Sequence, residues 1–414
     1  MKKESILICF TASYPYGNRE TYFDTELKYL SSAYDKIIIF PRYNPYSTDE
    51  RRKVPRNVEI MPPLVPQGVL RVVKGVFNLS PMSFYWSDFF NYKVYASKVK
   101  LKKWLNSLLG FRITFRILRK YLRRSQYCYL SLYSYWAEAP IMLTKEMRNL
   151  PKIVRMHGGD FYLDRNSNYL PLRQDIYKRS DLLLPISKDI KEILLNIYHV
   201  DKKKVYLNYL GIDNNKTLLV SATYTNPIVI VSCSNVIKLK RVDLIFKTLQ
   251  LLPNEYTIIW HHFGDGPNFS ELSKLVNNLK SNVKCNLHGW KTPQDLFTFY
   301  AENPVTWFIN VSKYEGVPVS IMEAFSFSIP AIATDVGGTS EIVNLKNGCL
   351  LPVDFEPNQL LDQILMVYDS DNYLRKRRQA YQTWKGEFEA RRNYQNLIVE
   401  LKRLEKKMFN DEEK

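Results

Sequence analysis

The sequence lacks the features of disulfide-bonded, metal-binding and membrane-spanning proteins. Its cysteines are odd in number, scattered and without a C-x-x-C pair, so reduced thiols in a cytosolic protein are expected. No stretch approaches the roughly 20 apolar residues that a membrane-spanning helix needs, so any membrane contact should be peripheral. The apolar run that follows Met1 is short and is preceded by Glu4, which favours a first β-strand over a signal peptide. The five cysteines are Cys9, Cys128, Cys233, Cys285 and Cys349.

Acidic residues are absent between Phe89 and Ala137, although the chain carries a net charge of +18. Such a local excess of positive charge predicts an anionic partner. On a helix, several basic residues of the 93–124 stretch would share one face opposite Ile117 and Leu118, an amphipathic pattern that could rest on an anionic membrane. An ordinary domain helix with its apolar face in the core explains the pattern equally well. No nucleic acid-binding motif is present, and no nucleic acid partner is expected. The shared basic face comprises Arg112, Arg116, Arg119, Lys120 and Arg123.

The remaining composition predicts a folded chain of 414 residues with more than one domain. Strand-like and helix-like runs alternate, which is typical of parallel α/β layers. In the first half we expect strands at 6–10, 36–40, 152–157 and 182–186, with helices at 21–32 and 188–198. In the second half we expect strands at 227–232, 256–261, 283–288 and 305–311, with helices at 242–251, 268–280, 293–301 and after Pro318.

The polar segment 211–226 is interpreted as a connection between two similar domains. We therefore predict an N-terminal Rossmann-like domain over 1–215, a C-terminal one over 216–383, and a helix within 384–414 that packs back on the first domain. In open sheets of this kind ligands bind at the carboxyl ends of the strands, so the functional residues should lie there.

The most informative segment is 311–343. Glu315 follows a predicted strand and could accept hydrogen bonds from sugar hydroxyls, and Pro318 is suited to the first position of the next helix. The free amides at such a helix start favour a phosphate or diphosphate. Glu323 would lie inside that helix among apolar residues, where a carboxylate is costly unless it meets a partner such as a ribose diol. The alternative is that Glu315 caps the helix and Glu323 points to water.

The spacing of Glu315 and Glu323 resembles the E-x7-E motif of the retaining glycosyltransferases of family 4, the bacterial polysaccharide-type group 1 enzymes with a GT-B fold. Gly337-Gly338, Glu341 and Asn347-Gly348 continue the likeness, as does the pattern Trp384, Phe388, Ala390, Asn393, Tyr394. The resemblance implies that Glu315 contacts the donor sugar and Glu323 the nucleotide ribose. It also implies a turn facing the phosphates, formed by Gly316, Val317 and Pro318.

Further residues are implied by the same resemblance. Lys240 matches a lysine that clamps the diphosphate, whereas Asn235 stands where the family has an arginine, so Lys238 or Arg241 would have to substitute. His157, followed by two glycines, matches a histidine that reaches the donor sugar. The adjacent Asp160 is expected to cap a helix or accept hydrogen bonds internally.

Two loops complete the predicted donor site. Gly264 and Gly266 resemble the G-x-G turn beside the nucleotide. In the loop 11–20 only Gly17 remains of a glycine-rich turn, and Arg19 either supplies charge to the diphosphate or marks a loop remodelled for the acceptor; Glu20 could bond within the loop. Adjacent His261 and His262 would point to opposite faces of a strand, which argues against one metal held by both.

The resemblance implies a glycosyltransferase that moves a hexose from a nucleoside diphosphate sugar to a hydroxyl of a polysaccharide or lipid-linked oligosaccharide. Neither cofactor nor metal is expected, and the protein should work in the cytoplasm, with a peripheral position on the inner face of the plasma membrane as one option. Alternatives are a nucleotide-sugar epimerase or a phosphorylase of the same fold, a glycosidase using Glu315 and Glu323, and a non-catalytic membrane or nucleic acid adaptor using the 93–124 stretch.

Overall fold

The chain folds into two compact units. The computed structural model describes residues 3–17, 20–46, 49–65, 75, 83–122, 129–135, 140–216 and 226–412. Unit 1 comprises Met1–Gly211 together with Arg391–Lys414, and unit 2 comprises Ile212–Ala390. The divisions fall at 211/212 and 390/391, a few residues from the predicted boundaries after 215 and 383. The end of the chain therefore belongs with its first half.

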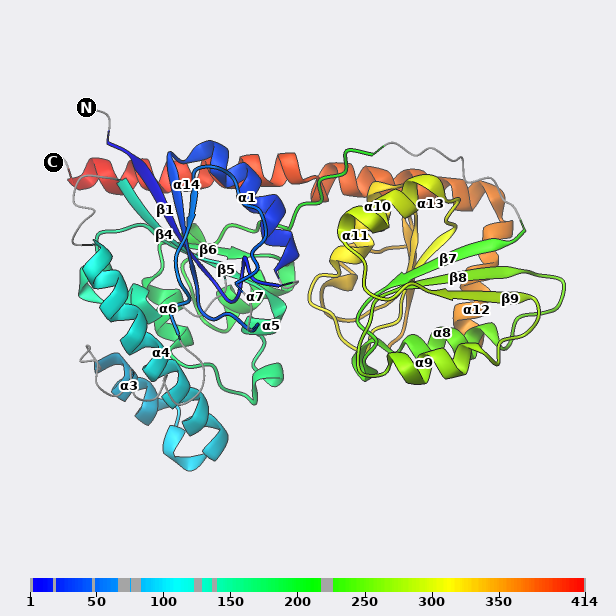
Figure 1. Ribbon diagram of the computed structural model, residues 1–414, viewed down its shortest axis with the longest axis horizontal. Coiled ribbons are helices and arrows are strands. Elements are labelled where there is room, and N and C mark those ends of the chain that lie inside the picture. Colours follow the sequence, from blue (N-terminus) through cyan, green and yellow to red (C-terminus); the bar gives the residue numbers. More distant parts are fainter. Residues whose placement is uncertain are drawn as a thin grey trace. The chain divides into compact units, whose positions relative to one another are not determined.

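Unit 1 is built on a parallel sheet with the strand order β3-β2-β1-β4-β5-β6 (Figure 1). Strands β1 and β2 are almost continuously apolar and buried, because helices cover both faces of such a sheet. The strands are β1 (Ser5–Thr11), β2 (Lys36–Pro41), β3 (Val58–Ile60), β4 (Tyr129–Ser134), β5 (Lys152–Met156) and β6 (Leu182–Pro185). The helices are α1 (Thr21–Ala33), α3 (Ser83–Asn91), α4 (Lys98–Leu122), α5 (Gly158–Phe161), α6 (Arg173–Arg179), α7 (Lys188–Asn196) and the last helix, α14 (Ala390–Glu412).

Unit 2 repeats this plan with the order β12-β11-β10-β7-β8-β9, with α8 and α9 on one face and α10 and α11 on the other (Figure 1). The prediction of an α/β protein with two Rossmann-like domains is confirmed. The strands are β7 (Ile228–Cys233), β8 (Ile258–Phe263), β9 (Val283–Leu287), β10 (Trp307–Asn310), β11 (Ala331–Thr334) and β12 (Gly348–Leu351). The helices are α8 (Val242–Leu249), α9 (Phe269–Val276), α10 (Pro293–Glu302), α11 (Val319–Ser326), α12 (Pro357–Leu365) and α13 (Ser370–Thr383).

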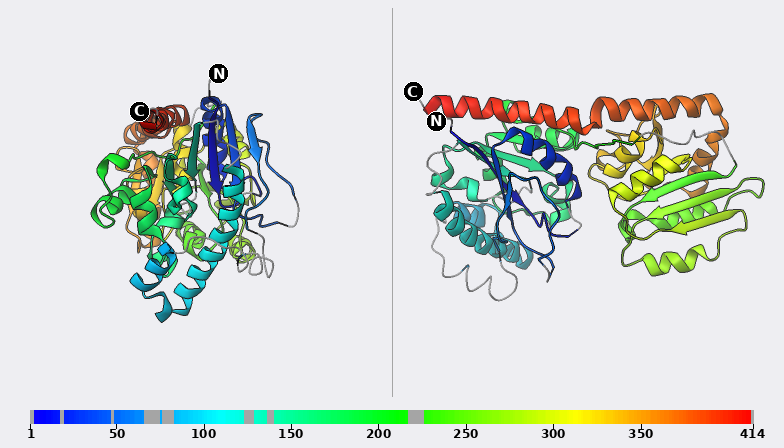
Figure 2. Two further views of the ribbon diagram at one scale, coloured as in Figure 1. Left: turned by 90° about the vertical axis from the view of Figure 1, so that its left-hand side faces the viewer. Right: turned by 45° about the horizontal axis from the view of Figure 1, so that its top comes forward.

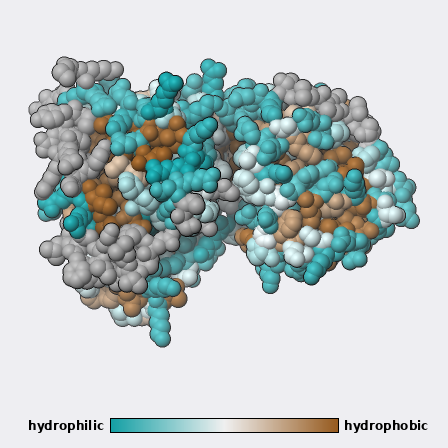
Figure 3. All heavy atoms as spheres, in the orientation of Figure 1, coloured by the Kyte–Doolittle hydropathy of each residue, from teal (hydrophilic) through white to brown (hydrophobic). Residues whose placement is uncertain are grey.

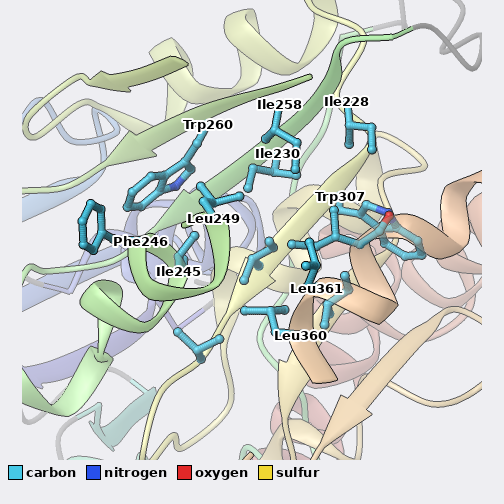
Figure 4. Packing of buried hydrophobic residues seen from close by; sticks show 14 of the residues in the cluster. Ile228, Ile230, Ile245, Phe246, Leu249, Ile258, Trp260, Trp307, Leu360 and Leu361 are labelled. Atoms are coloured by element: carbon cyan, nitrogen blue, oxygen red, sulfur yellow. The ribbon is translucent and has the colours of Figure 1, made fainter. Parts of the chain in front are cut away.

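The core of unit 2 contains two buried tryptophans, Trp260 and Trp307, packed among isoleucines and leucines (Figure 4). Each indole nitrogen has a polar partner: Trp260 Nε1 donates to Ser232 Oγ at 2.9 Å, and Trp307 Nε1 donates to the Ile364 carbonyl at 3.1 Å. These bonds satisfy the polar groups that would otherwise make burial of the indoles unfavourable. The core thus fixes the strands whose ends carry the predicted site.

Strand order in each sheet reverses direction at one point. The reversal lies between β1 and β4 in unit 1 and between β7 and β10 in unit 2. Ligands of doubly wound sheets bind outside the carboxyl ends of the strands at such a point. In unit 2 the segments that follow β7 and β10 are those that contain Lys240 and Glu315.

The C-terminal segment is not the single helix predicted over 384–408. A π-helix runs from Trp384 to Phe388, Glu389 is extended, and α14 begins at Ala390. The interruption has a local cause, because Ile212 pairs with this backbone: its amide donates to the Phe388 carbonyl at 2.8 Å and its carbonyl accepts from the Ala390 amide at 3.2 Å. The two connections between the units are therefore hydrogen-bonded to each other.

Helix α14 runs along unit 1 (Figure 2), and polar contacts hold it there. Glu405 accepts hydrogen bonds from Tyr34 at 2.6 Å and from Ser131 at 2.7 Å. Nearer the connection, the Tyr394 hydroxyl accepts from the Gly211 amide at 3.0 Å and the Asn393 carbonyl accepts from the Asn208 side chain at 3.0 Å.

Among the described residues, no helix has the length and apolar character needed to cross a membrane.

Candidate functional site

Glu315 and Lys240 form an ion pair at the strand ends of unit 2. Both side chains are largely buried, and the ammonium of Lys240 donates to Glu315 Oε1. The same oxygen accepts from Ser312 Oγ at 2.6 Å and from Asn310 Nδ2 at 3.2 Å. Glu315 is thus fixed by three donors and does not cap the following helix, so the structure brings together two residues that the sequence predicts for one site.

The turn at Glu315 and Gly316 is braced by a second glycine pair. A Cβ at Gly337, whose φ is +53°, would lie 2.0 Å from the Glu315 carbonyl oxygen, and a Cβ at Gly338 would lie 2.4 Å from that of Gly316. The Gly338 amide donates to the Gly316 carbonyl at 2.8 Å. Only glycine allows backbone to approach backbone this closely. The second half of the motif therefore shapes the turn that carries Glu315.

Helix α11 starts beside this turn without a side-chain cap. The prediction that Pro318 is the first helical residue is wrong: its ψ of 95° is not helical, so it precedes the helix, which begins at Val319. An uncapped start leaves amides unsatisfied and adds the positive end of the helix dipole, a combination that favours phosphate. Gly316, Val317 and Pro318 lead directly into this helix start.

Glu323 lies on α11 with its carboxylate in an apolar setting. Burial raises its pKa to about 7, and within the described part of the chain its carboxylate has no hydrogen bond or ion pair. Two groups lie within electrostatic range: the Cys233 thiol, whose pKa is raised to about 12 by burial and then by Glu323, and the Tyr300 hydroxyl. Tyr300 is buried and its hydroxyl also has no partner among the described residues. A ligand offering hydroxyls would satisfy both groups.

The residues around the predicted arginine position differ in their exposure and in their hydrogen bonds. Asn235 is exposed, and so is Lys238. Arg241 is not available as a substitute, because its guanidinium donates to the carbonyls of Val311 at 2.8 Å and Val353 at 2.5 Å. It instead holds the chain that leaves β10. Lys238 is left as the candidate to replace the missing charge.

Gly264 and Gly266 pack the turn after β8 against the segment after β7. A Cβ at Gly264 would lie 1.8 Å from the Ser234 carbonyl oxygen, and one at Gly266 would lie 2.6 Å from that of Val236. The Gly264 amide donates to the Gly289 carbonyl at 2.8 Å. These contacts explain why both positions are glycine, and they place the turn next to the segment that carries Asn235.

The loop between β1 and α1 in unit 1 is closed by an internal carboxylate. The amides of Ala12, Ser13 and Tyr14 donate to the buried Glu20 side chain at 3.0, 2.8 and 2.8 Å. The prediction that Glu20 bonds within the loop is confirmed. Three amides that could have met a phosphate are thereby occupied, which favours the remodelled-loop interpretation. Gly17 has a φ of +66°, and Arg19 lies outside the described residues.

His157 is buried at the end of β5 in unit 1. Its Nε2 lies 3.0 Å from the Tyr135 carbonyl oxygen, so this nitrogen carries the proton of a neutral ring. Burial, and next the Arg155 guanidinium, lower its pKa to about 3. The Asp160 carboxylate accepts the His157 amide at 2.9 Å, as the predicted internal acceptor. His157 and Gly17 belong to unit 1, whereas the other described candidates belong to unit 2.

The histidines of β8 have different surroundings. His261 Nδ1 lies 2.9 Å from His288 Nε2, while His262 Nδ1 lies 2.8 Å from Ser232 Oγ. The two neighbours thus point to opposite faces, as predicted. Within the ranges that the structure describes, no three His, Cys, Asp or Glu side chains are grouped to hold a metal ion.

Sequence reasoning missed several residues around the site. Asn310 and Ser312 orient Glu315, Arg241 holds the adjacent backbone, and Tyr300 approaches Glu323. Asn310 and Ser312 could have been singled out from the sequence, because they are polar residues at the end of an apolar strand and lie within five residues of Glu315. Tyr300 comes from another helix and had no signal in the sequence.

Comparison with known proteins finds a family resemblance that covers most of unit 2. Residues 215–384, nearly all of unit 2, match the family described as "Glycosyl transferases group 1". Unit 2 is therefore similar to the domain that this family shares. An uncharacterized glycosyltransferase of Methanocaldococcus jannaschii is 24% identical over 413 residues, covering 95% of this chain and 96% of that protein.

Two further comparisons concern an annotated relative and a solved structure. A putative colanic acid biosynthesis glycosyltransferase of Escherichia coli is 25% identical over 194 residues, 45% of this chain and 47% of that protein, so the match spans about half of this curated relative. The crystal structure of the Anabaena protein HepE in complex with UDP has a TM-score of 0.66 at 15% identity and covers 96% of this chain and 99% of that chain. The chain has the GT-B fold, and these findings support a transferase enzyme.

Proposed function

We propose that this protein is a retaining glycosyltransferase that transfers a hexose from a nucleoside diphosphate sugar to a hydroxyl of a polysaccharide or lipid-linked oligosaccharide in cell-surface glycan biosynthesis. The family match of unit 2 and the similarity to a putative colanic acid glycosyltransferase support the glycosyltransferase activity. Similarity to a protein crystallised with UDP supports a nucleotide-sugar donor. We propose that no metal or cofactor takes part and that the protein works in the cytoplasm.

The observation that carries the proposal is the meeting of Lys240, Glu315 and the uncapped start of α11 at the strand ends of unit 2. A leaving nucleoside diphosphate gains negative charge in the transition state, and a fixed ammonium and free amides stabilise that charge. In the described structure the ammonium rests on Glu315. The donor would exchange this contact for one from Lys240 to a phosphate, which frees the Glu315 carboxylate to accept a hydroxyl of the hexose.

Glu323 supplies the second part of the donor site. Its unpartnered carboxylate and the nearby Tyr300 hydroxyl provide one acceptor and one donor–acceptor group for a ribose diol. Pairing would remove the unfavourable burial of an isolated charge. The proposed site therefore holds two neighbouring parts of the donor by different means, the diphosphate by positive charge and the ribose by hydrogen bonds.

We propose that unit 1 binds the acceptor. It contains a pocket at the carboxyl ends of β1 and β2, bordered by α4 and lined mostly by apolar residues; the polar exceptions are Thr11, Arg42, Ser107 and Thr114. The Glu20 closure of the neighbouring loop removes amides that could have bound the donor's phosphates. We further propose that the donor's own phosphate takes the acceptor proton on the face from which the nucleotide leaves, which retains the anomeric configuration.

The first experiment is a thermal-shift screen of the purified full chain against UDP, GDP and ADP, because a ligand that binds only the native state raises the melting temperature. One nucleotide should stabilise the protein, and its sugar conjugate should then be consumed with an acceptor glycan. Product analysis by NMR should show the donor's anomeric configuration. Inversion would refute retention, and hydrolysis of a glycoside without any nucleotide would favour a glycosidase.

Independence from metal is tested by the same assay. Transfer should be unchanged after exhaustive treatment with a chelator. Loss of transfer that returns on adding Mg²⁺ or Mn²⁺ would refute this part of the proposal while leaving the donor site intact. Nucleotide-sugar interconversion without an acceptor would indicate an epimerase, and sugar phosphate formation with inorganic phosphate would indicate a phosphorylase.

A further inference from the structure

The apolar stripe of the basic helix α4 is used inside unit 1. Five apolar residues of this helix, Leu118 among them, lie in the core, while Arg116 and Arg119 are exposed; Ile117, which the sequence placed on the apolar face, is also exposed. The side chains of Lys120 and Arg123 lie outside the described residues. The stripe is therefore not available to enter a membrane, and the alternative of an ordinary domain helix describes this part of α4 correctly. The buried stripe comprises Trp104, Leu108, Phe111, Phe115 and Leu118.

A different apolar surface is exposed where α3 leads through the short helix Val94–Ala96 into α4. We call it the aromatic tip, and it consists of Trp86, Phe90, Tyr95 and Val99, which are 47%, 63%, 60% and 51% exposed. Hydrophobic surface is visible along the lower edge of unit 1 in Figure 3, where Figure 1 shows α3 and the start of α4. Large side chains exposed together mark an interaction surface.

The aromatic tip is held as one rigid cluster. Trp86 stacks on Phe90 with ring centroids 6.3 Å apart, and Phe89 contacts Phe90, Tyr95 and the buried Trp104 at 5.4, 5.9 and 5.1 Å. Trp104 Nε1 donates to the Tyr85 carbonyl at 3.0 Å, which ties the cluster to the core. The exposed rings are thus presented by a fixed scaffold.

Positive charge surrounds this tip. Lys93, Lys98 and Lys102 are exposed, whereas Lys100 and Lys103 donate to the carbonyls of Tyr92 and Asn166 and serve the fold. The nearest acidic residue in the sequence, Asp88, is buried and accepts hydrogen bonds from the Tyr169 hydroxyl and the Leu172 amide. The three exposed lysines therefore face solvent without a neutralising carboxylate on their own segment.

We propose that the aromatic tip and its three lysines dock on the surface of an anionic phospholipid membrane. Tryptophan and tyrosine favour the interface between headgroups and acyl chains, and each nearby lysine adds attraction to an anionic leaflet. A neutral protein partner would cover the rings but leave the three lysines without anionic partners. A second copy of this chain is itself basic and would repel them, so the positive charge favours an anionic membrane as the partner. The inference does not rest on the proposed transfer reaction, because docking is measured without donor or acceptor.

The test of charge uses flotation of the full chain with vesicles of phosphatidylcholine alone or mixed with phosphatidylglycerol. The protein should float with the anionic vesicles, and less so at high salt. The triple variant Lys93→Glu, Lys98→Glu, Lys102→Glu should bind on the order of 100-fold more weakly, since each lysine contributes about a factor of five at the surface. The matched control, Lys178→Glu, Lys202→Glu, Lys203→Glu, changes three exposed lysines elsewhere in unit 1 and should lose much less. Equal losses would overturn the proposal.

The test of the rings uses two matched pairs. Phe90→Ser with Tyr95→Ser should weaken vesicle binding about tenfold, whereas Ile197→Ser, at a residue 65% exposed in the same unit, should not. Quenching of tryptophan fluorescence by brominated lipid should be lost in Trp86→Phe and kept in Trp290→Phe, a residue of unit 2 that is equally exposed at 48%.

Two results would overturn the assignment of the surface. One is quenching that persists in Trp86→Phe, which would place the lipid elsewhere. The other is self-association of the wild-type chain in sedimentation velocity that disappears in the Phe90→Ser, Tyr95→Ser variant, because a second copy would then be the occupant. Circular dichroism melts of every variant show that the fold is kept.

Discussion

Glu26 in unit 1 and Glu323 in unit 2 have opposite surroundings. Glu26 on α1 of unit 1 accepts from the Tyr133 hydroxyl, and its Oε2 lies 3.1 Å from Arg155 Nη2. Arg155 in turn donates to Asn208 Oδ1 at 2.6 Å and to the Asn208 carbonyl at 3.0 Å. Glu323 on α11 of unit 2 has no such partner among the described residues. Glu26, whose partners come from the chain, serves the fold, whereas we propose that Glu323 is placed for a ligand.

The loops at the start of two helices show the same contrast. Before α1, three backbone amides are taken by Glu20, and before α11 no side chain caps the helix. Both loops follow central strands of similar sheets, so the sheet does not decide between them. A single carboxylate decides whether the loop closes on itself or stays available to an anion. This difference is the reason that we propose unit 2, and not unit 1, as the binding site of the diphosphate.

The largest expected effect is on transfer when the Glu315–Lys240 pair is broken. Lys240→Ala and Glu315→Ala should each lower kcat/KM by about 1000-fold or more, because each removes a group that stabilises the donor in the transition state. Steady-state assays measure the loss. Lys247→Ala and Glu302→Ala change exposed residues of unit 2 and should leave turnover unchanged. Full activity of either site variant would refute the site.

The next effect is on stability, when the partners of Glu26 are removed. Arg155→Met should lower the free energy of unfolding by about 3–5 kcal/mol, because it leaves a carboxylate buried without a countercharge. Urea denaturation measures it. Replacing both residues, Glu26→Leu with Arg155→Met, should restore much of the loss. A double variant as unstable as the single one would contradict the assignment of a buried pair.

Glu323 should behave in the opposite way. Because its pKa in the fold, about 7, lies above the unfolded value of 4.5, its favourable contribution is present below pH 4.5 and is lost as the pH rises through 7. Glu323→Gln should therefore stabilise the ligand-free protein by about 1–2 kcal/mol at pH 8 and change little at pH 4. Thermal melts at both pH values test this. Destabilisation at pH 8 would show that the carboxylate has a partner.

The smallest effect is expected for Glu20→Gln. An amide keeps one acceptor oxygen for the three backbone donors, so the cost should be about 1–2 kcal/mol. Thermal denaturation measures the cost, and nucleotide titration shows whether binding is affected. We expect affinity to be unchanged. A loss of nucleotide affinity would place phosphate at the β1–α1 loop after all.

The sequence was sufficient for the α/β architecture, because alternating apolar strands and amphipathic helices are local patterns. It was also sufficient to bring Glu315 and Lys240 to one site, since both follow strands of the same sheet. It was insufficient for the break at Glu389, which depends on Ile212 far away in the chain. The ion pair itself and the engagement of Arg241 depend on side-chain geometry that spacing does not contain.

The membrane prediction shows the same limit. Composition located the basic stretch, and helical periodicity found the two faces of α4. Periodicity did not show which apolar residues the core would bury, so the exposed rings of α3 were not singled out. Burial of Leu118 and exposure of Phe90 are properties of the packed unit and not of the local pattern.

The central claim is that the nucleotide is held by unit 2 at Glu323 and not by the loop that Glu20 closes in unit 1. Isothermal titration of the nucleoside diphosphate selected by the screen, with UDP as the first probe, tests it in the wild type, Glu323→Gln and Glu20→Gln. We predict about tenfold weaker binding in Glu323→Gln and unchanged binding in Glu20→Gln. Unchanged affinity in Glu323→Gln together with a loss in Glu20→Gln would contradict the account.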